Sequence, residues 1–163
     1  VIEDNYKLSK IYTSQQKRAI KTAQILSEVI NIDCTPIEGL EEMNLGQWEG
    51  LSWAEVKEKF PNEYGEWYAN RRYTKSPKGE SYQDVIERVL PVIHKIIEKN
   101  DNNVAIVTHS AVIMCIQCYL TDTPFEEMMR FKTDNTAIIE LDSESFLAAN
   151  KTNNMPIARR VAF

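Results

Sequence analysis

Two residues of this sequence stand where a strand pattern gives way to a helix pattern, and both have side chains that bind anions. His109 ends an apolar strand that begins at Val104, and a second apolar run follows it. Arg18 stands in the same way just after Ser14. Free N–H groups and the dipole favour anions at a helix N-terminus, so an arginine in the first turn makes sense where an anion lies between them. The pattern indicates an oxyanion site built from an imidazole and a guanidinium.

A carboxyl group that could act as an acid lies in the segment 40–50. Here Glu42 and other acidic residues alternate with apolar residues and glycines. A carboxyl group held against an apolar wall has a raised pKa and can protonate a leaving group. Each candidate also has a plainer interpretation. His109 can hydrogen-bond within the core, Arg18 can face solvent, and the segment can be an acidic surface loop.

The elements that would position these residues alternate along the chain. Apolar patterns predict strands at 8–13, 34–37, 136–141 and before His109, with helices between them. Helix starts are predicted from capping boxes at Thr13 with Gln16, Ser52 with Glu55, and Ser81 with Asp84. This alternation predicts an α/β fold with a mostly parallel sheet flanked by helices. We expect a single domain over residues 1–163, in which 43–80 form a cover or insertion.

Composition narrows the classes of partner. The chain has 163 residues, is 43% hydrophobic and carries a net charge of −5, which argues against nucleic acid and acidic membrane surfaces as partners. No apolar run reaches the roughly 20 residues of a membrane span. Three cysteines indicate reduced thiols in the cytoplasm, and Cys115 and Cys118 are expected to be core residues rather than a redox or zinc pair. No metal or other cofactor is predicted.

Four motifs, taken in order, resemble the histidine phosphatase family of the phosphoglycerate mutase-like superfamily. The resemblance runs from about Ile11 to Leu141, which is most of the chain. Its motifs are Ser14…Arg18-Ala19…Thr22-Ala23, Leu40-x-Glu42-x-x-x-Gly46-x-x-Glu49-Gly50, Gly79-Glu80-Ser81 and Val107-Thr108-His109.

The resemblance implies a mechanism and a role for each matched residue. A histidine attacks phosphorus and carries the phosphoryl group, and water then releases phosphate. Arg18 and His109 hold the transferring oxygens, and the backbone N–H of Ser110 joins them. Glu42 protonates the leaving group and later activates water. Between the motifs, the segment 62–78 contains Arg71 and Arg72, which either bind the substrate or belong to a packed surface loop.

The sequence departs from the family in one respect that bears on activity. The family's nucleophile lies in an Arg-His-Gly at the end of its first strand, and this sequence contains no Arg-His-Gly. The other histidine, His94, lies in a predicted helix. We expect a strand–loop–helix segment to precede Val1, so the fold as it stands lacks its first strand and helix. Without that strand the sheet has an unpaired central edge, unless another piece or the second chain of a homodimer supplies one.

The leading hypothesis is therefore a cytoplasmic phosphatase that acts on a small phosphorylated substrate when the N-terminal segment is present. A different class of function is a catalytically inactive relative that binds phosphorylated ligands or a protein partner, which the missing nucleophile favours. A phosphomutase is the alternative among enzymes. The short stretch between Glu42 and His109 favours hydrolysis over that reaction.

Overall fold

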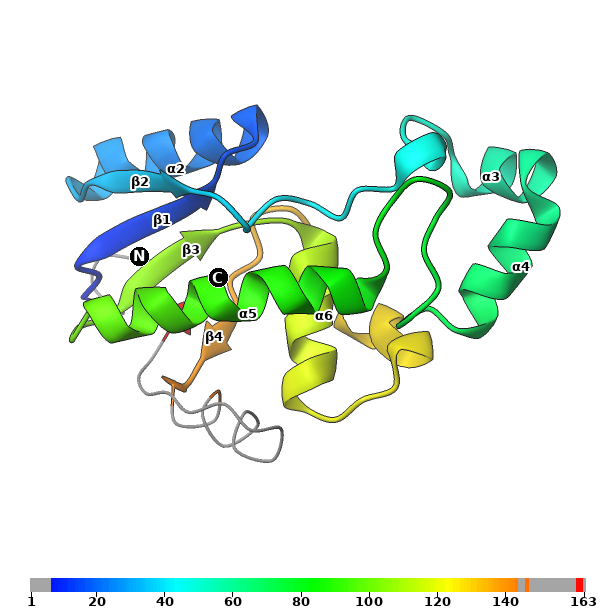
Figure 1. The fold of residues 1–163 in the computed structure, drawn as a ribbon. Coiled ribbons are helices and arrows are strands. Elements are labelled where there is room, and N and C mark those ends of the chain that lie inside the picture. The colour runs from blue at the N-terminus through cyan, green and yellow to red at the C-terminus, as the bar shows by residue number, and fades with distance from the viewer. Residues whose placement is uncertain (1–6, 144–145, 147–160, 163) are drawn as a thin grey trace.

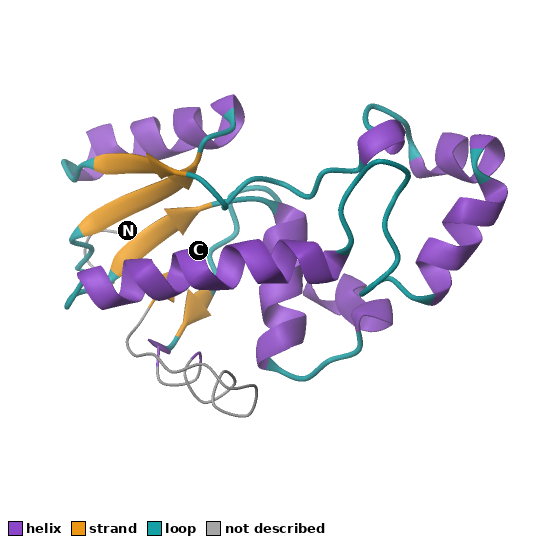
Figure 2. Cartoon of the chain, viewed as in Figure 1, coloured by secondary structure: helices purple, strands orange, loops and turns teal. Residues whose placement is uncertain are grey.

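The computed structural model describes residues 7–143, 146 and 161–162 and forms a five-stranded sheet in the order β2-β1-β3-β5-β4 (Figure 1). The strands are β1 (Lys10–Ser14), β2 (Cys34–Ile37), β3 (Val104–Val107), β4 (Glu140–Leu141) and β5 (Val161–Ala162). The helices are α2 (Lys17–Ile30), α3 (Trp53–Lys59), α4 (Pro61–Ala69), α5 (Tyr82–Lys99) and α6 (Ser110–Leu120), with 3-10 turns η1 (Gly46–Trp48) and η2 (Phe125–Phe131). All pairings are parallel except that of β4 with β5, which confirms the predicted α/β class (Figure 2).

The two central strands divide the core because successive side chains of a strand point to opposite faces. Ile11 of β1 and Ala105 of β3 pack with α2 in a small cluster. Their neighbours Tyr12 and Ile106 belong to the larger cluster, together with α5 and α6. Helices therefore cover both faces of the sheet, and the carboxyl ends of β1 and β3 share one edge (Figure 1).

Helix α5 is the longest element and begins at a capping box. The Ser81 hydroxyl oxygen accepts a hydrogen bond from the Asp84 N–H, and the Asp84 carboxylate accepts one from the Ser81 N–H. The predicted box at Ser52 and Glu55 is also present, at the start of α3. Both boxes satisfy backbone N–H groups that would otherwise have no partner within the helix. These two helix starts were therefore readable from sequence.

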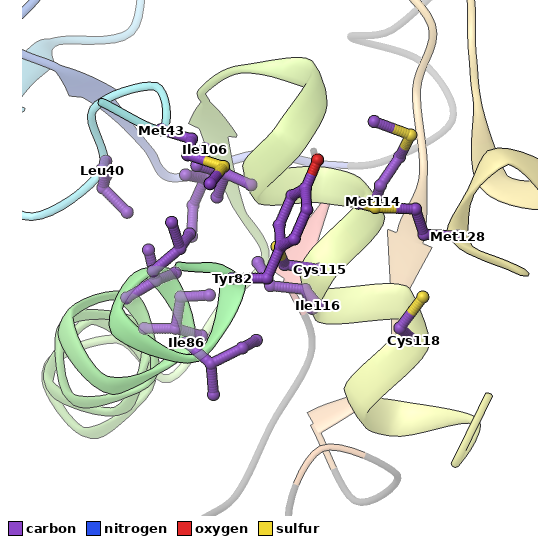
Figure 3. Close-up of a cluster of buried hydrophobic side chains, with 14 of the residues drawn as sticks. Leu40, Met43, Tyr82, Ile86, Ile106, Met114, Cys115, Ile116, Cys118 and Met128 are labelled. Atoms are coloured by element: carbon purple, nitrogen blue, oxygen red, sulfur yellow. The ribbon is translucent and has the colours of Figure 1, made fainter. Parts of the chain in front are cut away.

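The two cysteines of α6 lie in the core, as expected. Figure 3 shows Cys115 beside Tyr82 of α5, with Leu40 and Met43 approaching from the loop after β2. Cys115 and Cys118 are buried and make no disulfide. Burial raises the pKa of both thiols, so they stay protonated at neutral pH. They act as small apolar side chains of the core.

Three local expectations were wrong. The predicted capping box of Thr13 and Gln16 does not form, because β1 continues to Ser14 and Gln16 caps α2 without a side-chain hydrogen bond. The strand predicted at 136–141 contracts to β4. The second edge of β3 is not unpaired along its whole length, because β5 pairs with the first two of its four residues, Val104 and Ala105.

Residues 43–80 extend beyond the carboxyl edge of the sheet and carry η1, α3 and α4 (Figure 1). Trp48 and Trp67 are almost fully buried there and meet edge to face with centroids 5.6 Å apart. Aromatic packing thus joins this segment to the larger core cluster, in which Trp67 lies next to Tyr82 of α5. Among the described residues, every helix is too short or too polar to cross a bilayer.

Candidate active site

The strand pairing brings Arg18 and His109 together although they are 91 residues apart. β1 and β3 are parallel neighbours, with Thr13 opposite Val107, so the residues that follow them meet at the same edge. The Arg18 Nε–H donates a hydrogen bond to His109 Nδ1 at 3.2 Å. The other ring nitrogen, Nε2, lies 2.9 Å from the Ser14 hydroxyl oxygen. The predicted meeting of an imidazole and a guanidinium is therefore present in the structure.

These contacts define the charge and the tautomer of His109. A guanidinium only donates hydrogen bonds, so Nδ1 must be the accepting nitrogen and the ring proton lies on Nε2. Nε2–H then donates to Ser14, whose oxygen also accepts the Gln16 N–H at 3.2 Å. Burial and the positive charge of Arg18 lower the pKa of His109 to about 4, against an opposing effect of Glu41. The imidazole is therefore neutral at pH 7.

The Ser14–His109 contact superficially resembles the nucleophile and base of a serine hydrolase. In such a pair the base gains a proton, and an acceptor on its other nitrogen stabilises the resulting imidazolium. Here that other nitrogen faces Arg18, which disfavours the imidazolium. Ser14 is moreover fully buried. The arrangement therefore suits a neutral imidazole that orients the Arg18 guanidinium, and not a general base for serine. The expected contact of His109 with transferring oxygens stays a prediction.

Glu42 is anchored between the loop after β2 and the start of α6. Its neighbours Leu40 and Met43 are buried in the core. The Glu42 carboxylate accepts hydrogen bonds from the N–H groups of Met43 at 3.1 Å and Ala111 at 3.2 Å. Burial raises the pKa of Glu42, and these N–H groups and the charge of Arg18 oppose that shift without cancelling it. A carboxyl group in this state holds its proton to a higher pH than an exposed one, as a general acid requires.

Arg18 and Glu42 face a common cavity of about 540 Å³ at this edge of the sheet. Its wall is formed by Gln16, Arg18, Glu41, Glu42, Met43, Asn44, Leu45, Glu49, Glu80 and Arg88. Within the described residues, no group of three or more His, Cys, Asp or Glu side chains is arranged to hold a metal ion. The cavity therefore presents a guanidinium and an acid to a ligand, with the neutral His109 bound to the guanidinium.

The model of the histidine phosphatase superfamily, branch 1, matches residues 3–152. The chain belongs to the histidine phosphatase superfamily. It is 35% identical over 141 residues to 6-phosphofructo-2-kinase/fructose-2,6-bisphosphatase 3 of Bos taurus, a match that covers 86% of this chain and 29% of that protein. The chain thus spans under a third of that relative's length.

Two solved structures that are 25% and 29% identical to this chain have a similar fold. YhfR of Bacillus stearothermophilus is 29% identical with a TM-score of 0.67, over 77% of this chain and 63% of that chain. The α-ribazole phosphatase of Shigella flexneri is 25% identical with a TM-score of 0.68, over 80% of this chain and 65% of that chain. The resemblance seen in the four sequence motifs therefore extends to the fold of most of this chain.

In this histidine phosphatase chain, the structure places Arg71 and Arg72 apart from Arg18 and Glu42. Arg71 is 8% exposed, with its guanidinium over the rings of Trp67 and Tyr68. Arg72 donates a hydrogen bond to the Gln83 side chain at 2.9 Å. Within the described residues, neither arginine lines the cavity. Their role in substrate binding stays a prediction.

Ser110 is exposed at the first residue of α6, next to His109. The amide of the following residue, Ala111, is the one that hydrogen-bonds to Glu42. The helix start therefore contributes an N–H group to the acid. The predicted contact of the Ser110 N–H with phosphoryl oxygens stays a prediction.

Two charged residues of the cavity wall, Glu80 and Arg88, have no role predicted from the sequence, in which Glu80 enters only as part of the motif Gly79-Glu80-Ser81. In the structure Arg88 forms an ion pair with Glu80 at 2.7 Å, and both side chains are about three-quarters buried. Glu80 precedes the N-cap Ser81 and Arg88 lies within α5, so the pair does not have the i,i+3 or i,i+4 spacing that predicts a contact from sequence.

Gly46 lies in the loop that follows Glu42 and packs closely against the turn before α5. An alanine there is expected to destabilise the fold. The φ of Gly46 is +56°, and a Cβ would collide with the Pro77 carbonyl oxygen. We expect Gly46→Ala to lower the free energy of unfolding by at least about 2 kcal/mol. Urea denaturation measures the change. Gly65→Ala is the matched control, because Gly65 lies in α4 with open space around it and should give equal or greater stability. Equal effects of the two substitutions would contradict this reasoning.

Proposed function

We propose that this chain supplies the phosphoryl-binding and acid–base groups of a phosphomonoesterase that works through a phosphohistidine intermediate. The observation that supports it best is the contact of Arg18 with His109 beside a cavity that also contains the raised-pKa carboxyl of Glu42. An always-charged planar donor, held in place by a neutral imidazole, and an acid are groups that serve phosphoryl transfer to a nucleophile.

Each group has a defined step. Arg18 engages His109 through Nε, so its terminal amino groups are the donors for phosphoryl oxygens. Negative charge spreads over those oxygens in the transition state, and fixed donors stabilise it without reorganisation. Protonated Glu42 gives its proton to the leaving oxygen as the P–O bond breaks. The resulting carboxylate then takes a proton from water as water attacks the phosphohistidine, which restores the acid and releases phosphate.

The nucleophile in this proposal comes from outside the present sequence. His94 is the other of the two histidines in the sequence, and it packs against Phe146 with ring centroids 6.2 Å apart. It does not line the cavity formed by the described residues. We therefore propose that the full-length protein brings an N-terminal histidine to the edge of the sheet near His109.

The proposed substrate is a small phosphate ester, and the names of two relatives, a fructose-2,6-bisphosphatase and an α-ribazole phosphatase, point to sugar phosphates. Arg71 and Arg72 are proposed to help choose the ester. The free cysteines support a reducing, cytoplasmic location. A homodimer stays a prediction.

One observation favours the alternative of an inactive relative that binds phosphorylated ligands: the sequence contains no Arg-His-Gly. Assay of the full-length protein against a panel of sugar phosphates, with trapping of acid-labile phosphohistidine, separates the two. We expect phosphate release and a trapped phosphoenzyme. Phosphate binding without turnover would instead establish the inactive relative. Transfer of the phosphoryl group within the substrate, without release, would establish a mutase.

A further inference from the structure

Arg88 binds Glu80 and two points of the loop after β2 with one side chain. Its Nε and one terminal amino group donate to both oxygens of Glu80, at 2.7 and 3.0 Å. The other terminal amino group donates to the Gly39 carbonyl oxygen at 3.0 Å. A further hydrogen bond, at 3.2 Å, reaches the backbone carbonyl oxygen of Glu42. The guanidinium therefore contacts the backbone of the acid itself.

Glu80 extends this contact to the far side of Glu42. Its carboxylate accepts a hydrogen bond from the Asn44 N–H at 2.9 Å, and its own N–H donates to the Asn44 carbonyl oxygen at 2.8 Å. The pair of Arg88 and Glu80 thus grips the loop at Gly39, at Glu42 and at Asn44. A loop held on both sides of one residue has little freedom to move that residue.

We propose that Arg88, oriented by Glu80, is the positioning residue that keeps the Glu42 carboxyl at the start of α6 and facing the cavity. This inference rests on the proposed role of Glu42 as the acid. Arginine suits the position because its planar fork meets a carboxylate and two carbonyls at once, whereas the lysine ammonium is a compact charge on a flexible stem.

If Arg88 holds the loop, its loss should lower the pKa of Glu42. If Arg88 acts only through its charge, its loss should raise that pKa. The positive charge of Arg88 lowers the pKa of Glu42, while burial raises it more strongly. Loss of the charge alone would raise that pKa further. Release of the loop would expose the carboxyl and bring its pKa down toward the ordinary value near 4.5. The other titratable groups near Glu42 or along its cavity are Arg18, Glu41, Glu49, Glu80, Tyr82, His109 and Cys115.

The first test is the turnover of Arg88→Met, Arg88→Lys and Glu80→Gln in the full-length protein. For Arg88→Met we expect kcat to fall by about 100-fold, the effect of a misplaced catalytic group, while KM changes less than about threefold. Arg88→Lys should not restore kcat, and Glu80→Gln should show a smaller loss. Arg130→Met removes the same charge from an exposed ion pair with Glu127 and should keep full turnover. A rise in KM with unchanged kcat would overturn the proposal, because Arg88 would then bind substrate directly.

The second test measures Glu42 without any substrate. Glutamate side chains are labelled with carbon-13 in the full-length protein, and the Glu42 signal is assigned by its loss in Glu42→Gln. We expect Arg88→Lys, which keeps the positive charge, and Arg88→Met, which removes it, both to lower the pKa of Glu42, and Arg130→Met to leave it unchanged. A raised or unchanged pKa in both Arg88 variants would overturn the holding role. If the variants lower the pKa of Glu42 but the wild-type protein hydrolyses no ester, the positioning role is upheld and the proposed function is rejected.

Discussion

Replacement of Glu42 by glutamine is expected to leave the first chemical step with an activated ester almost intact and to slow steady turnover by about 100-fold. Glutamine keeps the size of the side chain and an oxygen for the Met43 and Ala111 N–H groups. It can neither give nor take a proton. The substitution therefore removes the acid–base function and preserves the position of the loop.

The leaving group distinguishes the two proton transfers. Nitrophenolate leaves without protonation, so p-nitrophenyl phosphate should phosphorylate the Glu42→Gln protein at nearly the normal rate. Attack of water on the phosphohistidine still needs a base. We expect a burst of nitrophenol equal to one turnover, followed by a slow steady rate, in rapid-mixing experiments. Sugar phosphates should show no burst, because their alkoxide leaving group needs the proton.

The pH dependence of the burst in the wild-type protein also reports whether Glu42 protonates the leaving group. Burial raises the pKa of Glu42, so the acid form persists to a pH above that of an exposed carboxyl. For a sugar phosphate, the first step should slow as pH rises through that pKa, and Glu42→Gln should lose this dependence. Glu58→Gln on the exposed side of α3 is the control and should behave as wild type. A normal steady rate in Glu42→Gln would exclude Glu42 from the mechanism.

The parts of the site that sequence predicted are those fixed by strand ends. Arg18 and His109 each follow a β-strand, and two parallel strands must end at the same edge of a sheet. The pattern of alternating elements was therefore enough to predict their meeting. The two capping boxes of α3 and α5 were equally readable, because their side-chain hydrogen bonds lie within four residues.

Contacts made across the fold were not readable. The capping box predicted at Thr13 failed because β1, paired with β2 and β3, continues to Ser14. The grip of Arg88 on Gly39 and Glu42 joins residues more than forty positions apart, and its partners are backbone carbonyls. Every residue has a backbone carbonyl, so the sequence does not indicate which of them accepts a hydrogen bond from a distant side chain. Local patterns thus predicted which groups gather, and the structure was needed to show what holds them.

Replacement of His109 by alanine is expected to lower kcat/KM by about 100-fold or more, the usual cost of misplacing a fixed donor to a developing oxyanion. The neutral imidazole accepts a hydrogen bond from the Arg18 Nε–H on one side and contacts Ser14 on the other. Alanine removes the acceptor that orients Arg18 and leaves the guanidinium free to move. Steady-state kinetics on sugar phosphates measure the loss. His94→Ala is the matched control, since His94 lies on α5 away from the cavity-lining residues, and it should keep kcat/KM.

The charge state of His109 gives a second measurement. Its pKa of about 4 means that no loss of activity between pH 8 and pH 5 should arise from its protonation. Bound inorganic phosphate adds negative charge beside the ring and favours the imidazolium, so it should raise the pKa of His109. Proton NMR of the ring in the full-length protein, with and without phosphate, follows this shift. A ring that titrates near 6.5 in both samples would mean that Arg18 and His109 do not meet in solution, and the proposed phosphoryl site would lose its basis.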